Sequence, residues 1–385
     1  MLHFQVNFGT LKSAVDFLVI LSVLVIAHEW GHFIAARLCG MRVDDFSLFF
    51  GKRLIRLGKR NGTEYNIRSI PLGGFVMIAG MDPNDAVVEE SGDVAADAKA
   101  RERANDPQAF YNKPLIQRAF VIFAGPLASI LFGYFLFCTI GFTMGLPNPS
   151  IQNQVQLVLK NSPADKAGLR AGDRIIKVDS QSINAADGPI LVHIIHHSIG
   201  KPLHLVILRG SQQLAIVATP YSAKVQDQLQ NGHLTTVTEG RLGFVPVTFV
   251  TYKKYSPIAS IRLGTRNIID DVEGMFKTIF SPHVREAVGG PIAIASYVSM
   301  ARQQGTVSLL ILGASLSISL GVINLFPIPI LDGGHLMLLA VEFVRRRKLS
   351  AREMQYANMF GLSVILLLMA LVMVSDIQKL MTGKL

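Results

Sequence analysis

The chain has 385 residues, of which 50% are hydrophobic and 17% charged, and its formal net charge is +10 at pH 7. This length allows two or three structural units. So high an apolar content with so few charges argues against an ordinary soluble protein and indicates membrane spans. The basic residues lie mostly beside apolar runs, as the flanks of membrane spans do, so the positive charge does not indicate a nucleic-acid partner.

Four apolar segments are long enough to cross about 30 Å of hydrocarbon, which needs around 20 residues. They are roughly Ala14–Leu38, Ala119–Leu146, Ser308–Ile330 and Met359–Val374. The link between the last two is short and contains RRRK at positions 345–348. Short loops rich in Lys and Arg stay in the cytoplasm. This orientation predicts that both termini and the segment Pro147–Thr306 lie outside, and that Gly40–Arg118 lies inside.

Between the first two spans, residues Phe46–Ile78 have the pattern of strands. Their centre is Asn61-Gly62, a strong hairpin signal. Gly73 and Gly74 interrupt the second run. The following segment, Asp82–Asp106, is charged and rich in Ala, which predicts a solvated loop.

The outside segment predicts one small β-rich domain. It contains a strand at Arg174–Val178, a hairpin pair at 202–210 and 214–220, a polar stretch at Tyr221–Glu239 and a last strand-like run, RLGFVPV, at 241–247. His193 and His197 are spaced as a possible metal pair, but no third ligand is evident, and a surface helix is the favoured interpretation.

The run HEWGH lies inside the first apolar segment. His28 and His32 are four residues apart, so on a helix they share one face and can bind one metal ion. Glu29 lies beside the first ligand and can act as a general base on water, which suits a hydrolytic zinc site. Two chance histidines packed in a helix are the alternative, but a membrane core selects against such residues unless they have a function.

A catalytic zinc site needs a third protein ligand, and the residues after His32 offer none. Asp332, at the end of the third apolar span, is the other carboxylate at a membrane-embedded position; its alternative role is a helix-ending Asp-Gly turn. His28 and His32 lie roughly 21–27 Å along the helix from Ala14, near the cytoplasmic side. Asp332 lies at the cytoplasmic end of a span that runs the same way, so the three residues are expected at similar depth.

The chain resembles the site-2 proteases, intramembrane zinc metalloproteases, of the bacterial regulator-of-sigma-E protease type. The resemblance covers almost the whole chain and rests on HEWGH, GTEYNIRSIPLGGFV, QRAFVIFAGPLAS, the PDZ-like SPADKAGLRAGDRIIKVD, GGPIAIA and GVINLFPIPILDGGH. It implies that His28, His32 and Asp332 bind Zn²⁺ and that Glu29 is the catalytic base. It also associates Asn324 with substrate handling.

The resemblance further implies the partners. Single-pass transmembrane proteins would be cut within the lipid bilayer after an upstream site-1 type protease has trimmed them; anti-sigma factors and remnant signal peptides are typical substrates. The implied location is the bacterial inner membrane. The chain departs from the pattern of the family at two places. Ser129 replaces the Asn that the family often has in AGPxAN, and one PDZ signature is present where the best-known relative has two.

The expected fold is a polytopic α-helical membrane protein with four transmembrane helices, a membrane-associated β-hairpin region and one exoplasmic PDZ-like, mixed α/β domain. The expected divisions are 1–38 (first helix), 39–118 (hairpin and charged loop), 119–146 (second helix), 147–250 (PDZ-like domain), 251–307 (linker with amphipathic segments), 308–335 (third helix) and 336–385 (basic loop and fourth helix).

Two further interpretations concern substrate binding. Gly73 and Gly74 would let an extended substrate pair with the hairpin, or the hairpin is an interfacial loop that only covers the site. Leu242, Gly243 and Phe244 would bind peptide C-termini, or the PDZ-like domain only excludes bulky substrates. Rival functions are a scaffold or pseudoprotease that binds without cutting, and an ion or proton carrier that uses His28, Glu29 and Asp332 as a relay.

Overall fold

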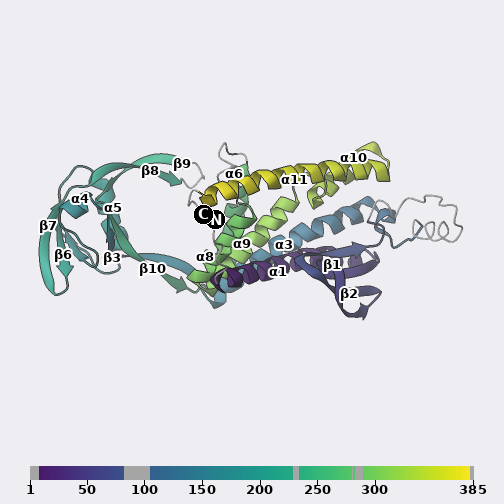
Figure 1. The fold of residues 1–385 in the computed structure, drawn as a ribbon, viewed down its shortest axis with the longest axis horizontal. Coiled ribbons are helices and arrows are strands. Elements are labelled where there is room, and N and C mark those ends of the chain that lie inside the picture. The colour runs from purple at the N-terminus through teal and green to yellow at the C-terminus, as the bar shows by residue number, and fades with distance from the viewer. Residues whose placement is uncertain (1–7, 82–104, 229–233, 280, 282–288, 382–385) are drawn as a thin grey trace, which may run out of the picture. The chain divides into compact units, whose positions relative to one another are not determined.

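The computed structural model describes residues 8–81, 105–228, 234–279, 281 and 289–381. The chain divides into two compact units, Met1–Thr143 with Tyr255–Leu385, and Met144–Lys254. Figure 1 shows that the first unit is mainly helical and the second mainly β-strands. The charged loop expected over Asp82–Asp106 lies almost entirely outside the described residues.

Four helices of the first unit are long and apolar enough to cross a membrane. They are α1 (Phe8–Leu38, with its apolar part at Val15–Leu38), α3 (Leu115–Thr143), α9 (Thr306–Asn324) and α11 (Ala351–Met381). At 1.5 Å per residue, even the 19 residues of α9 reach roughly 28 Å, about the thickness of the hydrocarbon layer. The expected four-span architecture is confirmed, and we call this unit the membrane unit.

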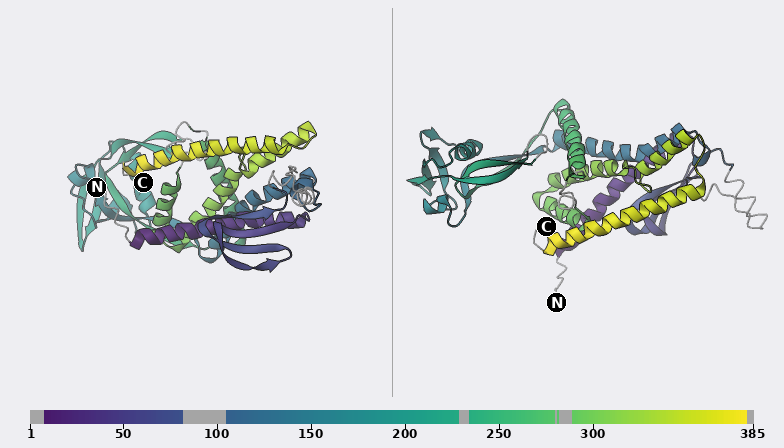
Figure 2. Two further views of the ribbon diagram at one scale, coloured as in Figure 1. Left: turned by 45° about the vertical axis from the view of Figure 1, so that its right-hand side comes forward. Right: turned by 90° about the horizontal axis from the view of Figure 1, so that it is seen from above.

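Helix α3 packs against both α1 and α9 (Figure 2). Glycines permit the close approach: a Cβ at Gly31 of α1 would collide with the Ala124 carbonyl of α3. A Cβ at Gly133 of α3 would likewise lie 2.5 Å from the carbonyl oxygen of Ala314 in α9. Membrane helices associate through such small residues because lipid tails are as apolar as the helix surfaces. Helix α3 therefore packs closely against the HEWGH helix at Gly31 and against α9 at Gly133.

The shorter helices of the membrane unit are η2 (Phe110–Asn112), α6 (Pro257–Ile279), α8 (Pro291–Gln304) and α10 (Asp332–Arg345). The sequence places Asp332 at the end of the third span, but α9 already ends at Asn324 and Asp332 begins α10. Two prolines between them, Pro327 and Pro329, cannot donate helical hydrogen bonds. A Cβ at Gly333 would collide with the Leu325 carbonyl, so the start of α10 packs closely on this turn.

Strands β1 (Val43–Arg60) and β2 (Thr63–Ile78) form the hairpin that Asn61-Gly62 predicts. Both turn residues have positive φ, 51° and 87°, as a type I′ turn requires. The sheet folds back on itself, because Phe46 of β1 pairs with Tyr65 and also with Val76. The end of β2 therefore borders the start of β1, and β2 also packs against α1.

We call Met144–Lys254 the β-rich unit. Its elements are β3 (Leu146–Val158), α4 (Pro163–Lys166), β4 (Arg174–Val178), β5 (Gln181–Ser182), α5 (Gly188–His197), β6 (Leu203–Arg209), β7 (Gln212–Ala218), β8 (Tyr221–Gln228), β9 (Leu234–Arg241) and β10 (Phe244–Lys253). One sheet has the order β10-β3-β4-β6-β7 with β5 beside β4, and β8 and β9 form a separate antiparallel pair. The sheet and α5 enclose a core that includes Ile175, Leu191, Leu205, Ile207 and Leu242.

Several expectations for this unit are confirmed. Strand β4 has the expected bounds, Arg174–Val178. Strands β6 and β7 form the expected hairpin pair, and His193 and His197 lie on a helix. The polar stretch at Tyr221–Glu239 is not irregular, since it largely forms β8 and β9. Strand β3 was not anticipated either, because its Pro and Gln residues break the alternation that marks a half-buried strand.

Candidate metal centre

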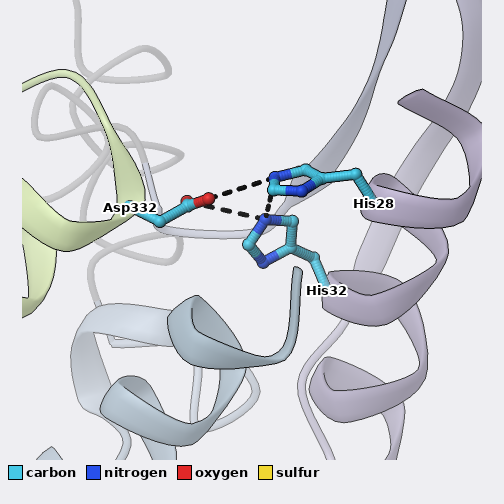
Figure 3. Close-up of side chains that lie close together, drawn as sticks. All are labelled: His28, His32 and Asp332. Carbon is cyan, nitrogen blue, oxygen red and sulfur yellow. Dashed lines mark hydrogen bonds and ion pairs between the residues drawn. The ribbon is translucent and has the colours of Figure 1, made fainter. Parts of the chain in front are cut away.

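Two histidines of α1 and the first residue of α10 meet inside the membrane unit. Asp332 Oδ2 lies 3.0 Å from His28 Nε2, and Asp332 Oδ1 lies 3.5 Å from His32 Nε2. The two Nε2 atoms are 3.2 Å apart. Figure 3 shows the two rings, one helical turn apart, pointing toward the carboxylate. Both histidines are buried, each with 7% of its surface exposed.

The other nitrogen of each ring is held by α3. His28 Nδ1 lies 3.0 Å from Ser129 Oγ, and His32 Nδ1 lies 2.9 Å from the Val121 carbonyl oxygen. Because a carbonyl only accepts, His32 carries its proton on Nδ1 and leaves the Nε2 lone pair free. Hydrogen bonds of this kind fix the tautomer and orientation of metal-binding histidines. Helix α3 therefore directs both Nε2 atoms toward Asp332.

Glycines make room for this cluster on two sides. A Cβ at Gly125 of α3 would collide with the Nε2 atom of His32. A Cβ at Gly334 of α10 would collide with the Ile328 carbonyl, on the turn before Asp332. The glycine of AGPLAS thus lies where the backbone of α3 closely approaches His32. The second glycine of LDGGH lies where α10 closely approaches the turn that precedes Asp332.

The three side chains fit a zinc ion. Their ligand atoms all lie within 4.8 Å of one another. A tetrahedral site with bonds of about 2.1 Å has edges of roughly 3.4 Å between ligand atoms, and the three observed separations run from 3.0 to 3.5 Å. Two imidazoles and one carboxylate are a usual donor set for catalytic zinc, which leaves a fourth position for water or substrate.

Glu29 lies next to this cluster in the chain and contacts the hairpin. Its Oε2 accepts a hydrogen bond of 3.0 Å from the backbone N–H of Val76 in β2. The end of β2 is therefore anchored at the residue that the sequence indicates as the general base. Nearby in β2, Gly73 has φ 79°, and a Cβ at Gly74 would lie 2.9 Å from the Ser47 carbonyl oxygen.

The other candidate residues lie apart from the cluster. Asn324 is the half-buried last residue of α9. In the β-rich unit, Leu242 is buried in the core with 2% exposure, Gly243 has φ 81°, and Phe244 begins β10. The rings of His193 and His197 stack with centroids 4.1 Å apart, and both side chains are exposed. Among the described residues, His28, His32 and Asp332 are the group of three metal-binding side chains that lie close enough to hold one ion.

One residue at the centre was underestimated from sequence. Because Ser129 replaces the expected Asn, no firm role was assigned to it, yet its side chain is buried and contacts His28. The AGPLAS motif, which contains Ser129, is the sequence feature that could have indicated this role. The Val121 contact had no sequence signal, because a backbone carbonyl has no residue type.

A His–His–Asp cluster among four membrane-crossing helices defines the class of multi-pass membrane metalloproteases. The comparisons agree, since the model of Peptidase family M50 matches residues 16–368. The chain belongs to this family and is a zinc metalloprotease. This agrees with the resemblance of its motifs to those of site-2 proteases.

Curated relatives extend over the whole chain. A protein of Mesorhizobium japonicum named "Putative zinc metalloprotease mll0638" is 32% identical over 373 residues, covering 95% of this chain and 99% of the relative. The regulator of sigma-E protease RseP of Salmonella typhimurium is 29% identical over 467 residues, covering 94% and 98%. The second alignment is longer than this chain of 385 residues, so the Salmonella protein contains sequence that this chain lacks.

Proposed function

We propose that this metalloprotease cleaves transmembrane proteins within the lipid bilayer. The observation that carries the proposal is the location of the His28, His32 and Asp332 cluster, because both histidines lie inside the candidate span Val15–Leu38. A substrate must therefore enter the hydrocarbon region to reach it. Polar groups are costly at such a position and support a function there.

In the proposed mechanism each residue has one role. His28, His32 and Asp332 would hold zinc, which supplies Lewis acidity at the scissile peptide carbonyl and lowers the pKa of the attacking water. The Glu29 carboxylate takes a proton from that water and later gives it to the leaving amine. Ser129 and the Val121 carbonyl keep the imidazoles oriented.

Glu29→Gln tests the proposal. The variant should keep its zinc and its fold, because the amide is isosteric, but lose cleavage of a model membrane substrate by about 100-fold or more. Purified wild type and variant are compared in the same lipid vesicles, with zinc measured by mass spectrometry. A soluble, unfolded peptide is the second substrate. Cleavage of the membrane substrate by Glu29→Gln at the wild-type rate would exclude Glu29 as the base. If the wild-type protein cleaves the soluble peptide but not the membrane substrate, a transmembrane substrate is excluded.

The end of β2 is the proposed binding site for an unwound substrate. Helical substrates hide their backbone in hydrogen bonds, so cutting requires an extended segment. Residues 74–78 pair with β1 on one side, and the Val76 N–H already reaches Glu29. A substrate strand added along this edge would pass the catalytic residue, and Asn324 would assist in holding it. The alternative remains a hairpin that only covers the site.

Gly74→Pro, with Gly74→Ala as the matched control, separates these two roles. Both variants place a Cβ near the Ser47 carbonyl, but only proline removes the amide donor. We expect Gly74→Pro to cleave helical substrates at least tenfold more slowly than Gly74→Ala, with zinc retained in both. A substrate loosened by helix-breaking residues should suffer less, because less unwinding must be stabilised. If Gly74→Pro slows the cleavage of the helical and the loosened substrate equally, the hairpin only covers the site.

Substrates and topology follow from the same proposal. The Salmonella relative is named as a regulator of sigma-E, which supports anti-sigma factors as substrates here, with remnant signal peptides as a second class, both after a first cut by an upstream site-1 type protease. In a bacterial inner membrane, the basic segment 345–348 would place the active site toward the cytoplasm and both termini and the β-rich unit outside.

The β-rich unit has two proposed roles that remain open. Strand β10 is a terminal strand of its sheet and begins at Phe244, so peptide C-termini could add there. Alternatively the unit excludes bulky substrates by size. Leu242 contributes to the core in either case, since its side chain is buried.

A further inference from the structure

A basic cleft of about 570 Å³ lies at the far end of α10 from Asp332, in the membrane unit. Its lining residues are Leu115 and Arg118 of α3, Glu342, Phe343 and Val344 of α10, and Arg346, Arg347 and Lys348 of the loop that follows. Four of these are cations and one is a carboxylate. The proposed proteolytic mechanism uses none of them.

The carboxylate is already neutralised by a buried ion pair. Arg118 Nη2 donates to Glu342 Oε2 at 2.7 Å, and only 5% of each residue is exposed. Glu342 Oε1 accepts the Leu349 N–H at 3.0 Å. Arg118 Nε is buried and has no hydrogen-bond partner within the described part of the chain. The cleft therefore has a fixed cation in its wall with unused donor capacity.

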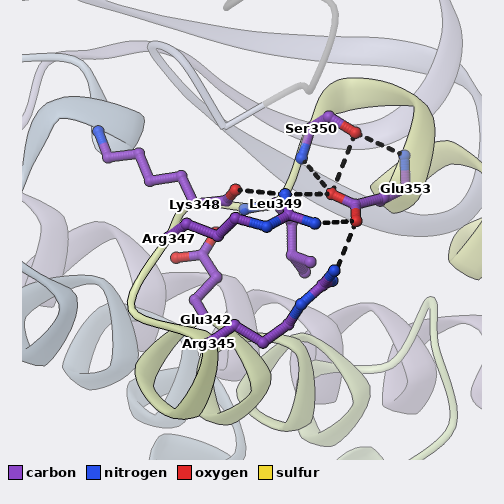
Figure 4. Close-up of polar contacts among 7 residues, drawn as sticks. All are labelled: Glu342, Arg345, Arg347, Lys348, Leu349, Ser350 and Glu353. Carbon is purple, nitrogen blue, oxygen red and sulfur yellow. Dashed lines mark hydrogen bonds and ion pairs between the residues drawn. The ribbon is translucent and has the colours of Figure 1, made fainter.

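Two of the loop cations, Arg347 and Lys348, are held in place rather than freely extended. Figure 4 shows Glu353 at the centre of this arrangement, where it accepts hydrogen bonds from Arg345, Arg347 and Ser350. Lys348 Nζ donates to the Tyr111 carbonyl at 2.6 Å and lies 4.0 Å from the centroid of that ring.

Positive charge prevails in the cleft. No carboxylate among the described residues pairs with Lys348 or with Arg346, which ends α10 with φ 51°. Partial burial, together with the positive charge of Arg118, lowers the pKa of Lys348. A bound anion would relieve this repulsion. The first turn of α3, which begins at Leu115, adds the positive end of a helix dipole.

Apolar side chains surround these cations. Phe343 and Val344 line the cleft and are 72% and 78% exposed. Ile116, next to the cleft residue Leu115, is 80% exposed. A site that binds a free anion from water does not need apolar side chains exposed around it. A phospholipid has both an anionic phosphate and acyl chains, and the cleft lies where the membrane-crossing helices α3 and α11 begin.

We propose that this cleft binds the headgroup of an anionic phospholipid from the adjacent membrane leaflet. The phosphate lies between Arg346 and Lys348, with Arg118 in the wall behind it, and the acyl chains lie over Phe343 and Val344. General attraction between basic loops and membranes accounts for the number of cations here. It does not account for a buried arginine with a free donor, or for the fixed side chains of Arg347 and Lys348 at a cleft with an apolar rim.

The experiment counts lipid adducts on the purified full chain by native mass spectrometry. The probes are phosphatidylglycerol, phosphatidylcholine and inorganic phosphate. Arg346→Gln and Lys348→Gln each remove one cation from the cleft. Arg352→Gln, the matched control, removes the same charge from an exposed position in the first turn of α11 that does not line the cleft. Zinc content serves as the check that each variant is folded.

We expect each cleft variant to bind phosphatidylglycerol about fivefold more weakly than Arg352→Gln does. Phosphatidylcholine should bind more weakly to all of them, with no difference between variants. Equal losses in all three variants would reduce the effect to general attraction and overturn the proposal. Equal affinity of the wild type for the two lipids would overturn it as well.

Two further arms identify the source of the phosphate. Inorganic phosphate should fail to displace phosphatidylglycerol at millimolar concentration, and displacement would assign the cleft to a free anion instead. Phe343→Ser should weaken phosphatidylglycerol binding at least threefold, because the acyl chains lose apolar contact. Unchanged binding in Phe343→Ser would overturn the lipid assignment.

Discussion

The membrane unit and the β-rich unit both bury polar side chains, but they give them different partners. In the membrane unit, buried polar groups join helices that are far apart in sequence: His28 contacts Asp332, and Arg118 contacts Glu342. In the β-rich unit, a buried side-chain amide instead satisfies backbone carbonyls. Asn153 donates to the Ile175 and Ile183 carbonyls.

The difference has a physical cause. In a membrane the backbone of each helix satisfies itself, so a buried polar side chain is retained for chemistry or for fixing one helix against another. In the β-rich unit, short strands and their ends leave buried backbone groups that the sheet does not pair, and side chains such as Asn153 satisfy them. Variants in the first set should therefore change metal binding or helix packing, and variants in the second should change folding stability alone.

Asp376 shows that a buried carboxylate in the membrane unit need not be catalytic. It lies near the end of α11 and is fully buried. Its two oxygens accept the backbone N–H groups of Gly290, Ile292 and Ala293, at the start of α8. This contact caps α8, which begins within the GGPIAIA motif, and ties α11 to α8. Residue type alone would not distinguish Asp376 from Asp332, whereas their partners do.

Asp332→Ala is expected to have the largest effect. Two histidines alone hold zinc poorly, so bound zinc should fall well below one ion per chain and cleavage of a membrane substrate should cease. Zinc is measured by mass spectrometry after gel filtration. Asp173→Asn, which removes a buried carboxylate of the β-rich unit, is the control and should retain zinc. Full zinc occupancy with normal activity in Asp332→Ala would point to another third ligand.

Ser129→Ala should have a smaller effect on the same centre. Loss of a hydrogen bond to a ligating histidine typically weakens metal binding by about 10- to 100-fold. The matched control is Ser317→Ala, because Ser317 is also fully buried and donates to the Ser129 carbonyl but does not contact the histidines. Competition with a zinc chelator gives both affinities.

A rescue sharpens this test. Ser129→Asn restores the residue that the family often has at this position, and its side-chain oxygen can accept from His28 Nδ1. It should bind zinc nearly as well as the wild type. If Ser129→Ala loses no more zinc than Ser317→Ala, then Ser129 fills space beside His28 without orienting it.

Features set by local spacing were predictable from sequence. The four spans follow from length and hydropathy, and the shared face of His28 and His32 follows from the helical repeat. The turn at Asn61-Gly62 follows from the two residues that accept positive φ. The expected depth of Asp332 in the membrane matched that of the two histidines, and the three side chains do lie close together. The position of Asp332 at the start of a new helix was not predicted.

Features set by contacts between distant segments were not predictable. Ser129 lies 101 positions from His28, and Glu342 lies 224 positions from Arg118. Such pairs depend on helix rotation and register, which the hydropathy of either helix alone does not determine. The pairing of Phe46 with both Tyr65 and Val76 brings together two parts of β2 that are far apart along the strand, which the hairpin turn alone does not determine. The sequence therefore predicts which side chains form the candidate zinc site better than which groups position them.

Asp173→Asn should have the smallest effect, on the stability of the β-rich unit. Asp173 is 1% exposed and accepts hydrogen bonds of 2.8 Å from Arg209 Nε, Arg209 Nη2 and the Arg170 N–H. Burial raises the pKa of this carboxyl, but the hydrogen bonds and the charge of Arg209 outweigh burial, so the pKa lies below its ordinary value. Removing the charge should lower the free energy of unfolding by about 1–3 kcal/mol at pH 7.

The pH dependence of that difference is the decisive measurement. A carboxyl whose pKa is lower in the folded state contributes stability above its unfolded pKa, near 3.9, and this contribution is lost as the pH falls through the folded value. Urea unfolding of the segment Met144–Lys254, followed by circular dichroism, should show a constant gap between wild type and Asp173→Asn from pH 7 to pH 5. The gap should narrow below about pH 4, as the wild-type carboxyl takes up its proton. Arg209→Met should remove the same pH-dependent part, because it leaves Asp173 without its main partner. A gap that stays constant down to pH 3 would mean that Asp173 acts through its shape and neutral hydrogen bonds, and buried charge would then matter in the membrane unit but not in the β-rich unit.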